Sequence, residues 1–391
     1  GAIGVITSAE LADNAVTTDK LINDAVTNPK ILDETITDAK LDNPKRRNLI
    51  INGDMRIAQR DTSVTGKTSS GYFTVDRWLM DIGTAGTWTI SQSTDVPSGQ
   101  GFGYSTKWDC TTANGSLSAG SFMTHQQRFE GQELQRLKKG TSNAETTTIS
   151  FWVKSNKTGT YIVEIEDRDN TRHISQSYTI DSADTWEKKT LTFAGDTTGA
   201  FDNDTAASVH LFFWLVAGTN YSSGTLATSW AAKTNANRAV GQVNLADSTS
   251  NEFYITGVQW ELGSTASDFE HEDLYQQKLK CYRYYYQSDG SSAEFKIHGS
   301  GTIFQTTNAD ICMDLPVQTR SVPTVATANT AIQAGATTYA VTGISEVSGT
   351  DGGLDRLFLR CATGGTMTVA QGCILTNNNN AGGKITVSSE L

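Results

Sequence analysis

A ten-residue repeat near the beginning of the chain constrains its fold more than any other feature. The triplets Ala-Val-Thr, Ala-Val-Thr and Thr-Ile-Thr at 15–17, 25–27 and 35–37 are each followed, after two residues, by a lysine and an aliphatic residue. The aliphatic side chains alone recur every five residues, at Ile6, Leu11, Val16, Leu21, Val26, Ile31, Ile36 and Leu41. This interval fits neither the 3.6-residue period of a helix nor the two-residue period of a strand. A repeating turn and extended segment, with each threonine capping a short turn, fits better.

One aliphatic side chain in five residues is too few for such a segment to fold alone. Each buried side chain contributes roughly 1.5 to 3 kcal/mol, whereas ordering each residue's backbone costs roughly 1 to 2 kcal/mol. Copies from several chains, wound about a common axis, would bury these side chains together. We therefore expect residues 1–47 to form an oligomeric stalk, with a disordered polar linker as the alternative.

The composition of the 391 residues indicates a mostly β protein and excludes some partners. There is room for two or three domains, and 35 glycines with long Ser, Thr and Asn stretches take the place of charged residues, which make up 19%. A net charge of -11 would repel nucleic acid. The longest apolar run, 211–217, is too short to span a membrane. The chain begins at Gly1 without a basic-then-apolar leader, so we expect a missing start or no signal peptide.

The five cysteines are widely spaced and include no Cys-x-x-Cys motif. Their odd number argues against a disulfide framework, and their spacing argues against a zinc site. We expect reduced, buried thiols and no cofactor.

Strand patterns are dense between residues 48 and 270. Strand-like runs broken by Gly, Ser, Asn and Asp loops are predicted at 149–153, 161–165, 186–193, 209–216 and 253–260, and the run at 186–193 alternates apolar and polar residues. The first two flank a predicted turn at Thr158-Gly159. This spacing favours a two-sheet antiparallel sandwich of jelly-roll type. Within it, 124–140 is the one stretch with a helical pattern, since Leu134 and Leu137 are three residues apart and Gly140 follows as a possible cap.

Several motifs, in this order, resemble those of bacteriophage tail-fibre and receptor-binding proteins. They are NLIINGDMRIAQR (48–60), YFTVDRW (72–78), SFWVKSNKTGTYIVEI (150–165), YITGVQWELG (254–263), CYRYYY (281–286) and TRSVPTV (319–325). The threonine-and-lysine repeats that precede them are also similar to stalk segments of such fibres, so the resemblance covers about 6–325.

The resemblance implies a jelly-roll module similar to carbohydrate-binding modules, carried on a homotrimeric fibre at the surface of the extracellular virion. The stalk would then trimerise and attach to other tail or capsid proteins, and the fibre would contact a host surface glycan. Related modules often hold a structural calcium. This chain keeps Asn52-Gly53-Asp54, but 254–258 lacks the acidic pair that completes the site, so no metal is predicted.

Aromatic rings in loops are the candidate binding residues, because an exposed ring can stack on the C–H face of a sugar. All eight tryptophans lie between residues 78 and 260. Those in strand-like runs, Trp152, Trp186, Trp214 and Trp260, are assigned to packing. The rings bounded by Gly, Ser, Thr or Asn are predicted to bind carbohydrate: Trp88, Tyr104, Trp108, Tyr221 and Trp230.

Patterns typical of catalysis are missing from the sequence. Glu164 and Glu166 share one strand face, which suits a solvated edge better than the two sides of a glycosidic bond. The five histidines are far apart and include no His-x-x-x-His, and 66–68 lacks the upstream glycine of a phosphate loop. We expect no enzymatic activity and no catalytic residue.

The remaining residues form a connector and a smaller domain. Apolar spacing within 271–286 predicts a connector helix. Residues 287–391 are rich in Gly, Thr and Ala, and strands are predicted at 295–298, 356–361 and 384–388, so we expect a C-terminal β domain. The four asparagines at 377–380 are a candidate contact loop or only flexible polar sequence.

Together these patterns favour a non-enzymatic phage tail-fibre protein that recognises a host surface glycan as a trimer. Two other hypotheses remain. The first is a capsid-attached or purely structural fibre in which the jelly roll is a spacer. The second is a polysaccharide depolymerase or a secreted glycan-binding module.

Overall fold

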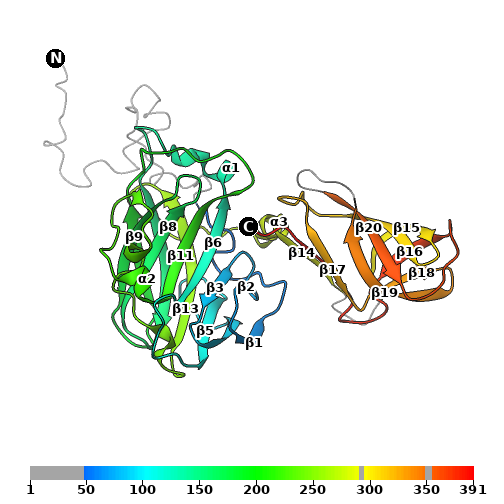
Figure 1. Cartoon of the computed structure of the whole chain (residues 1–391), viewed down its shortest axis with the longest axis horizontal. Helices are drawn as coiled ribbons and strands as arrows, with labels where there is room; N and C mark the ends of the chain where they lie inside the picture. Colours follow the sequence, from blue (N-terminus) through cyan, green and yellow to red (C-terminus); the bar gives the residue numbers. More distant parts are fainter. Residues whose placement is uncertain (1–47, 290–294, 348–354) are drawn as a thin grey trace, which may run out of the picture. The chain divides into compact units, whose positions relative to one another are not determined.

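The computed structural model describes residues 48–289, 295–347 and 355–391. The predicted stalk, residues 1–47, lies outside these ranges. Strands dominate the described residues and helices are few and short, which confirms the mostly β class (Figure 1). No helix in these three ranges is long and apolar enough to cross a membrane.

Two antiparallel sheets form the central sandwich. The first has six strands in the order β1-β4-β5-β13-β7-β10. Its strands are β1 (Ser63–Lys67), β4 (Thr87–Ser93), β5 (Ser105–Thr112), β7 (Thr147–Ser155), β10 (Glu187–Phe193) and β13 (Glu252–Leu262). The second has seven strands in the order β12-β9-β8-β11-β6-β3-β2 and faces the reader in Figure 1. Its strands are β2 (Gly71–Tyr72), β3 (Leu79–Gly83), β6 (Phe122–Glu130), β8 (Gly159–Asp167), β9 (Arg172–Ile180), β11 (Ala207–Ala217) and β12 (Ala231–Ala232).

The chain crosses repeatedly between the two sheets, as a jelly roll requires. From β6 onward it passes to β7 in the six-stranded sheet, returns for β8 and β9, and crosses again for β10, β11 and β13. The five predicted strands are therefore present as β7, β8, β10, β11 and β13. Gly159, the second residue of the predicted turn and the first of β8, has a φ of +123°, which only glycine adopts readily.

Side-chain alternation on β11 separates the sandwich core from the outer surface of its sheet. Leu211, Phe213 and Leu215 are fully buried in the core between the sheets. The intervening Phe212 and Trp214 belong to a separate apolar cluster on the other face of the same strand. The seven-stranded sheet therefore has apolar side chains on both faces.

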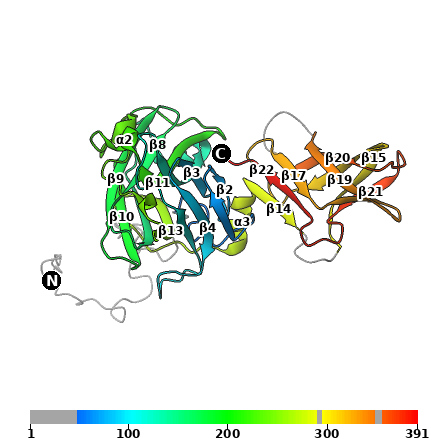
Figure 2. The ribbon, with the colours of Figure 1, turned by 60° about the horizontal axis from the view of Figure 1, so that its bottom comes forward.

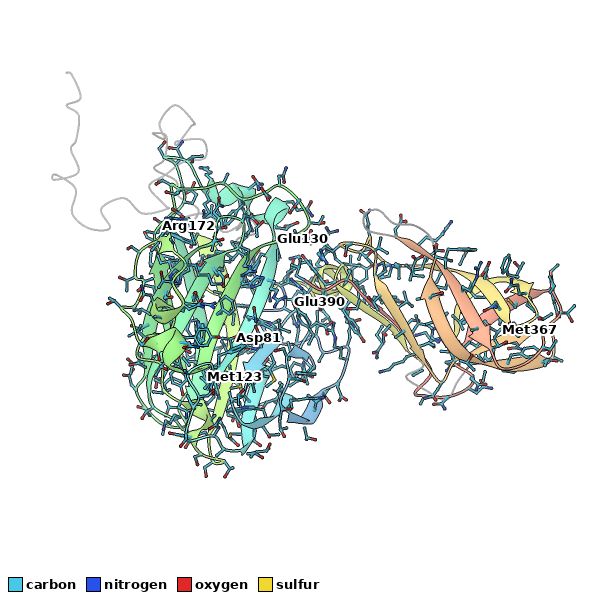
Figure 3. The ribbon with its side chains drawn as sticks, viewed as in Figure 1. Asp81, Met123, Glu130, Arg172, Met367 and Glu390 are labelled. Carbon is cyan, nitrogen blue, oxygen red and sulfur yellow. The ribbon has the colours of Figure 1, made fainter. Side chains whose placement is uncertain are left out.

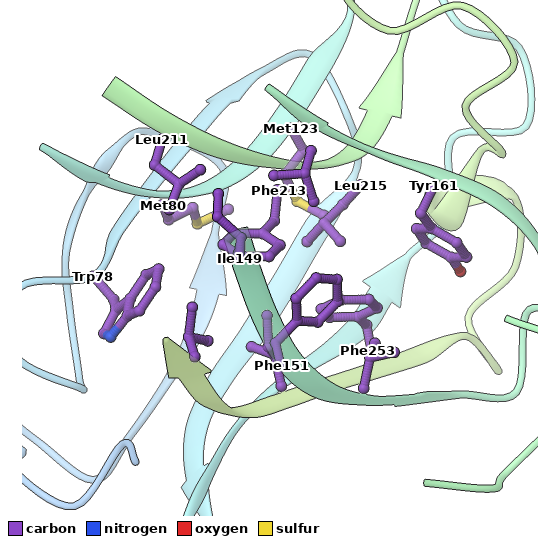
Figure 4. Close-up of a cluster of buried hydrophobic side chains, with 14 of the residues drawn as sticks. Trp78, Met80, Met123, Ile149, Phe151, Tyr161, Leu211, Phe213, Leu215 and Phe253 are labelled. Carbon is purple, nitrogen blue, oxygen red and sulfur yellow. The ribbon is translucent and has the colours of Figure 1, made fainter. Parts of the chain in front are cut away.

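Aromatic side chains fill much of the core (Figure 4). The ring of Phe213 lies edge-on to that of Phe151 on β7, with 5.1 Å between centroids. Tyr161 on β8 lies 5.7 Å from Phe253 on β13. Both contacts join opposite sheets, so the aromatic residues of the predicted strands hold the two layers together.

The opening motif packs against β13, which explains why two distant motifs occur together. A Cβ on Gly53 would lie 2.1 Å from the carbonyl oxygen of Val258, so only glycine fits this approach. The amide of Val258 in turn donates to the carbonyl of Gly53 at 3.0 Å. The indole of Trp78, from the second motif, donates to the carbonyl of Asn52 at 3.0 Å. The three motifs therefore form one junction.

The helix predicted at 124–140 is mostly wrong. Its first seven residues belong to β6, and only α1 (Gly131–Leu134) and a 3-10 turn (Gln135–Leu137) are helical. β6 pairs with β11 on one side and β3 on the other, and these partners satisfy its backbone hydrogen bonds. The apolar spacing of Leu134 and Leu137 remains meaningful, since both are buried in the sandwich core.

Two further α-helices accompany the strands. α2 (Thr219–Ser222) follows β11, and α3 (Leu274–Tyr282) lies within the predicted connector. The carboxylate of Asp273 caps α3 by accepting from the amide of Tyr275 at 2.8 Å. The predicted connector helix is confirmed, though it ends at Tyr282 and β14 follows.

The C-terminal residues form the predicted β domain. A closed barrel contains β15 (Ile297–Gln305), β16 (Asn308–Asp314), β18 (Ala331–Ala334), β19 (Thr337–Glu346), β20 (Arg356–Thr363) and β21 (Gly372–Thr376). A three-stranded sheet contains β14 (Tyr285–Asp289), β17 (Thr324–Ala328) and β22 (Lys384–Ser388) (Figure 2). The strands predicted at 356–361 and 384–388 are confirmed as β20 and β22, and the predicted strand at 295–298 begins two residues later as β15.

The last residues of the chain bind charged side chains of the sandwich. Glu390 accepts from Arg77, whose guanidinium is buried, at 2.5 Å, and from Arg60 at 3.0 Å. The guanidinium of Arg77 also lies 3.4 Å from the ring centroid of Tyr284. The ion pairs of Glu390 therefore hold the chain after β22 against the sandwich, and the cation–π contact holds the residue before β14 there as well.

The prediction for the cysteines needs one correction. All five are free thiols, and four are buried, but Cys312 on β16 is exposed. Its neighbours Ile311 and Met313 point into the barrel, so alternation places Cys312 on the outer surface.

Candidate functional site

An open cleft of about 260 Å³ lies on the outer face of the seven-stranded sheet. Residues of β3, β6, β8 and β11 line its floor, and residues from the segment between β11 and β13 line its wall. Asp81 on β3, at one side of the cleft, is labelled in Figure 3. The cleft is large enough for part of an extended ligand and is the best candidate site in the described residues.

Four aromatic rings form the apolar part of the cleft. Trp214 on β11 lies 5.3 Å from Tyr221 of α2, and Tyr221 lies 5.7 Å from Phe122. Phe212 lies 6.2 Å from Trp214. Trp214 is fully buried, whereas Tyr221 and Phe122 are half-buried. The exposed parts of Tyr221 and Phe122 are therefore the ring surface that a ligand meets first.

Beneath these rings, Glu164 on β8 is fully buried and fully hydrogen-bonded. Its Oε1 bonds to Nδ1 of His173 at 3.0 Å and accepts from Nε of Arg238 at 2.9 Å. Its Oε2 accepts from the indole of Trp214 at 2.8 Å. The carboxylate therefore orients the tryptophan ring and neutralises the arginine.

Glu166, two residues further along β8, binds three cations. Arg168 and Lys233 donate to its Oε1 at 2.6 and 2.7 Å, and Arg238 donates to its Oε2 at 2.9 Å. Burial alone would raise the pKa of Glu166, but the charge of Arg238 and the hydrogen bonds from Lys233 and Arg168 outweigh it and hold the pKa at about 2. Glu166 is thus ionised at any physiological pH.

This network predicts an acid-sensitive contribution to stability. Because the pKa of Glu166 is about 2 when folded and 4.5 ordinarily, its stabilising effect is complete above pH 4.5 and is lost as pH falls through about 2. In urea unfolding followed by tryptophan fluorescence, the stability difference between the natural chain and a Glu166→Gln variant should shrink across that range. A difference that stays constant would show that Glu166 is not bound by these cations.

His210 adds a neutral side chain to the cleft. Burial, and then the positive charge of Arg128, lower the pKa of His210 to about 3. Its imidazole is therefore uncharged at neutral pH. Neither His210 nor Glu166 therefore changes its charge between about pH 5 and 8.

The predicted loop position is wrong for two of the five candidate carbohydrate-binding rings. Trp88 on β4 and Trp108 on β5 are 0% and 1% exposed and belong to the sandwich core. Each is followed two residues later by another core residue, Ile90 or Cys110, so both rings point inward. They pack the core and cannot stack on a ligand.

The other three predicted rings lie at different places. Tyr221 is in the cleft. Trp230 lines a separate small pocket with Trp260, and its indole donates to the carbonyl of Ala194 at 2.7 Å. Tyr104 is 38% exposed, and its carbonyl accepts from Thr256 of β13, in the other sheet. The structure therefore does not bring the predicted rings into one site.

Some tryptophans assigned to packing are more accessible than expected. Trp186 and Trp152 are half-buried. The ring of Trp186 lies 6.2 Å from Tyr254, and its indole donates to Asp95 at 2.9 Å. This smaller aromatic group belongs to the six-stranded sheet and has its own ion pairs, Lys154 with Asp95 and Lys107 with Glu252.

The sequence also gave the wrong environment for Glu164 and Glu166. They do share a strand face, as predicted, but they are buried and ion-paired instead of lying at a solvated edge. Within residues 48–289, 295–347 and 355–391, no three His, Cys, Asp or Glu side chains lie close enough together to hold a metal ion.

Comparisons with known proteins reveal only remote likenesses. No protein-family model matches the chain, and no curated protein matches it. Among solved structures, the enzymatically active domain of tailspike protein 4 of bacteriophage CBA120 is 14% identical with a TM-score of 0.28, over 55% of this chain and 21% of that one. This chain thus matches about a fifth of the tailspike chain.

Two smaller proteins are matched over nearly their whole lengths. TmCBM61, solved with β-1,4-galactotriose, is 8% identical with a TM-score of 0.29, over 56% of this chain and 99% of that one. A family 11 carbohydrate-binding module of a cellulosomal cellulase from Clostridium thermocellum is 15% identical with a TM-score of 0.24, over 54% and 99%. At these low scores, the description of the fold rests on the strand order above.

Proposed function

We propose that this protein is a glycan-binding, non-enzymatic component of a phage tail fibre and that the cleft on the seven-stranded sheet holds the glycan. The observation that carries the proposal is the combination of half-buried rings with hydrogen-bonding side chains in one open cleft. Sugars offer C–H faces to rings and hydroxyl groups to polar side chains, and this cleft presents both kinds of partner.

The rigidity of the cleft supports a binding role. Trp214 and Arg238 are fixed by Glu164, and Tyr221 lies against Trp214. Side chains that are already ordered lose little entropy when a ligand binds. The cleft is therefore preorganised for a ligand of defined shape.

The ionisation of Glu166 supports binding without catalysis. Glycoside hydrolysis needs a carboxyl group whose pKa is raised so that it can protonate the leaving oxygen. The cations around Glu166 hold its pKa at about 2, which is the opposite direction. Incubation with host polysaccharide followed by a reducing-end assay is expected to yield no new ends, and new ends would refute this part of the proposal.

Replacing Tyr221 with alanine is the direct test of the cleft. An aromatic ring that stacks on a sugar contributes a large share of the binding free energy at a small interface. We therefore expect affinity for a bound glycan to fall by about tenfold or more in Tyr221→Ala. Tyr104→Ala is the matched control, because Tyr104 is exposed and lies beside the other sheet. A glycan array and isothermal titration would measure both. Equal losses, or a loss only in Tyr104→Ala, would move the site away from the cleft.

Attachment to a virion and trimer formation rest on the sequence repeats and on the resemblance to tail-fibre proteins. We expect a mass in solution near three times the 42.2 kDa of one chain. Deleting residues 1–44 should weaken assembly, because this removes the repeated aliphatic side chains. A stable monomer of the full chain would contradict this. Three weak sites on one fibre would give avidity roughly 10²-fold above a single site.

A further inference from the structure

The charges that line the cleft differ from those of the chain as a whole. The chain carries a net charge of -11, yet four cations line the cleft: Arg128, Arg168, Lys233 and Arg238. Two carboxylates line it with them, Asp81 and Glu166. Even when Glu164 beneath the rings is counted, positive charges outnumber negative ones. The cleft is thus locally positive on an acidic protein.

Most of the polar groups in the cleft that remain available to bind a ligand are hydrogen-bond donors. Between them, Glu164 and Glu166 accept from three cations, a tryptophan and a histidine, so their acceptor oxygens are largely used. Arg168 donates one of its five N–H groups to Glu166, and Lys233 donates one of its three ammonium hydrogens to the same residue. These two cations keep donors for a ligand.

The same two cations are accessible. The side chain of Arg168 is 47% exposed and that of Lys233 is 19% exposed, while the Glu166 they share is 2% exposed. They come from different segments, Arg168 directly after β8 and Lys233 directly after β12, and both donate to one carboxylate oxygen. Two cationic donors that converge on one carboxylate oxygen suit an oxyanion better than a single hydroxyl group.

We infer that the ligand of this cleft is an acidic saccharide, whose carboxylate or phosphate is bound by Arg168 and Lys233 while a sugar ring lies against Tyr221. This inference rests on the proposed glycan-binding function and specifies its ligand class. A neutral glycan would leave the donors of both cations without an ionic partner, whereas an oxyanion would receive charge-assisted hydrogen bonds from each.

The test uses the full chain and a glycan array with three arms. One arm holds oligogalacturonates and the same oligosaccharides after carboxyl reduction, the second holds glycans with phosphate groups, and the third holds neutral hexose oligomers. The variant Arg168→Gln/Lys233→Gln removes both cations, and Lys138→Gln/Lys188→Gln removes equal charge at exposed positions outside the cleft. Tryptophan fluorescence verifies that each variant is folded.

We expect binding to be confined to the carboxylated or the phosphorylated arm, which identifies the anionic group. Affinity should fall by about tenfold or more in the cleft variant, remain unchanged in the control variant and weaken with added salt. If neutral glycans bind and Tyr221→Ala abolishes their binding while the cleft variant does not, the glycan function stands and this inference fails. If acidic glycans bind equally to the cleft variant, the inference also fails. If no glycan binds, both proposals fail.

Discussion

Lys139→Met is expected to lower the free energy of unfolding of the sandwich by about 3 to 5 kcal/mol, the usual cost of leaving a buried charge unpaired. The Lys139 side chain is 4% exposed and its ammonium lies 2.6 Å from Asp167 and 3.2 Å from Asp196, which are 0% and 3% exposed. It also donates to the carbonyls of Thr198 and Gly199, each at 2.7 Å. Methionine would keep the packing but remove every one of these bonds.

The neighbouring lysine is the matched control for this prediction. Lys138 pairs with Glu145, but their side chains are 55% and 32% exposed. Water replaces such a pair readily, so Lys138→Met should change stability by less than about 1 kcal/mol. Urea unfolding followed by tryptophan fluorescence reports on the sandwich alone, because all eight tryptophans lie between residues 78 and 260. Equal effects of the two substitutions would contradict the assigned network.

Arg238→Met should have a similar cost of about 3 to 5 kcal/mol and should also disorder the cleft. Arg238 bridges the buried Glu164 and Glu166, and its guanidinium lies 5.0 Å and 5.1 Å from the ring centroids of Phe212 and Trp214. Without it, Glu164 keeps only His173 and Trp214 as partners. The cleft would then lose both its neutralising charge and its fixed ring positions.

Arg168→Met is the control for Arg238→Met, because it removes a positive charge beside the same Glu166 without removing buried contacts. Arg168 binds the same Glu166, but its side chain is 47% exposed. Its removal should cost less than about 1 kcal/mol. If Arg238→Met proved as mild as Arg168→Met, the buried network would not be what stabilises the segment between β11 and β13.

The fold could be predicted best where a short stretch of sequence carries the signal, as in strand alternation or a glycine at a close contact. Alternation of apolar and polar residues marks the predicted strand at 186–193, and Gly53 is required by its close approach to Val258. The same rule, applied to Trp88 and Trp108, would have placed them inside, because Ile90 and Cys110 follow two residues later. Flanking Thr and Gly residues suggested loops there, and that inference was wrong.

The cleft could not be predicted from the sequence, because the residues that form it are far apart in the chain. Arg238 lies 74 residues from Glu164, in a segment without regular alternation, so nothing near Glu164 signals its partner. β6 was missed for a similar reason, since its strand partners β3 and β11 come from distant segments. The one available signal was β11 itself, in which Phe212 and Trp214 on the face opposite Phe213 indicate a sheet covered on both sides.

A crystal structure of the full chain with the oligosaccharide that binds most tightly on the array would test the central claim most directly. We predict sugar density on the outer face of β6, β8 and β11, with a ring against Tyr221 and polar groups within hydrogen-bonding distance of Arg168 or Lys233. Sugar bound instead beside Trp186 on the six-stranded sheet, or in the pocket of Trp230, would contradict it.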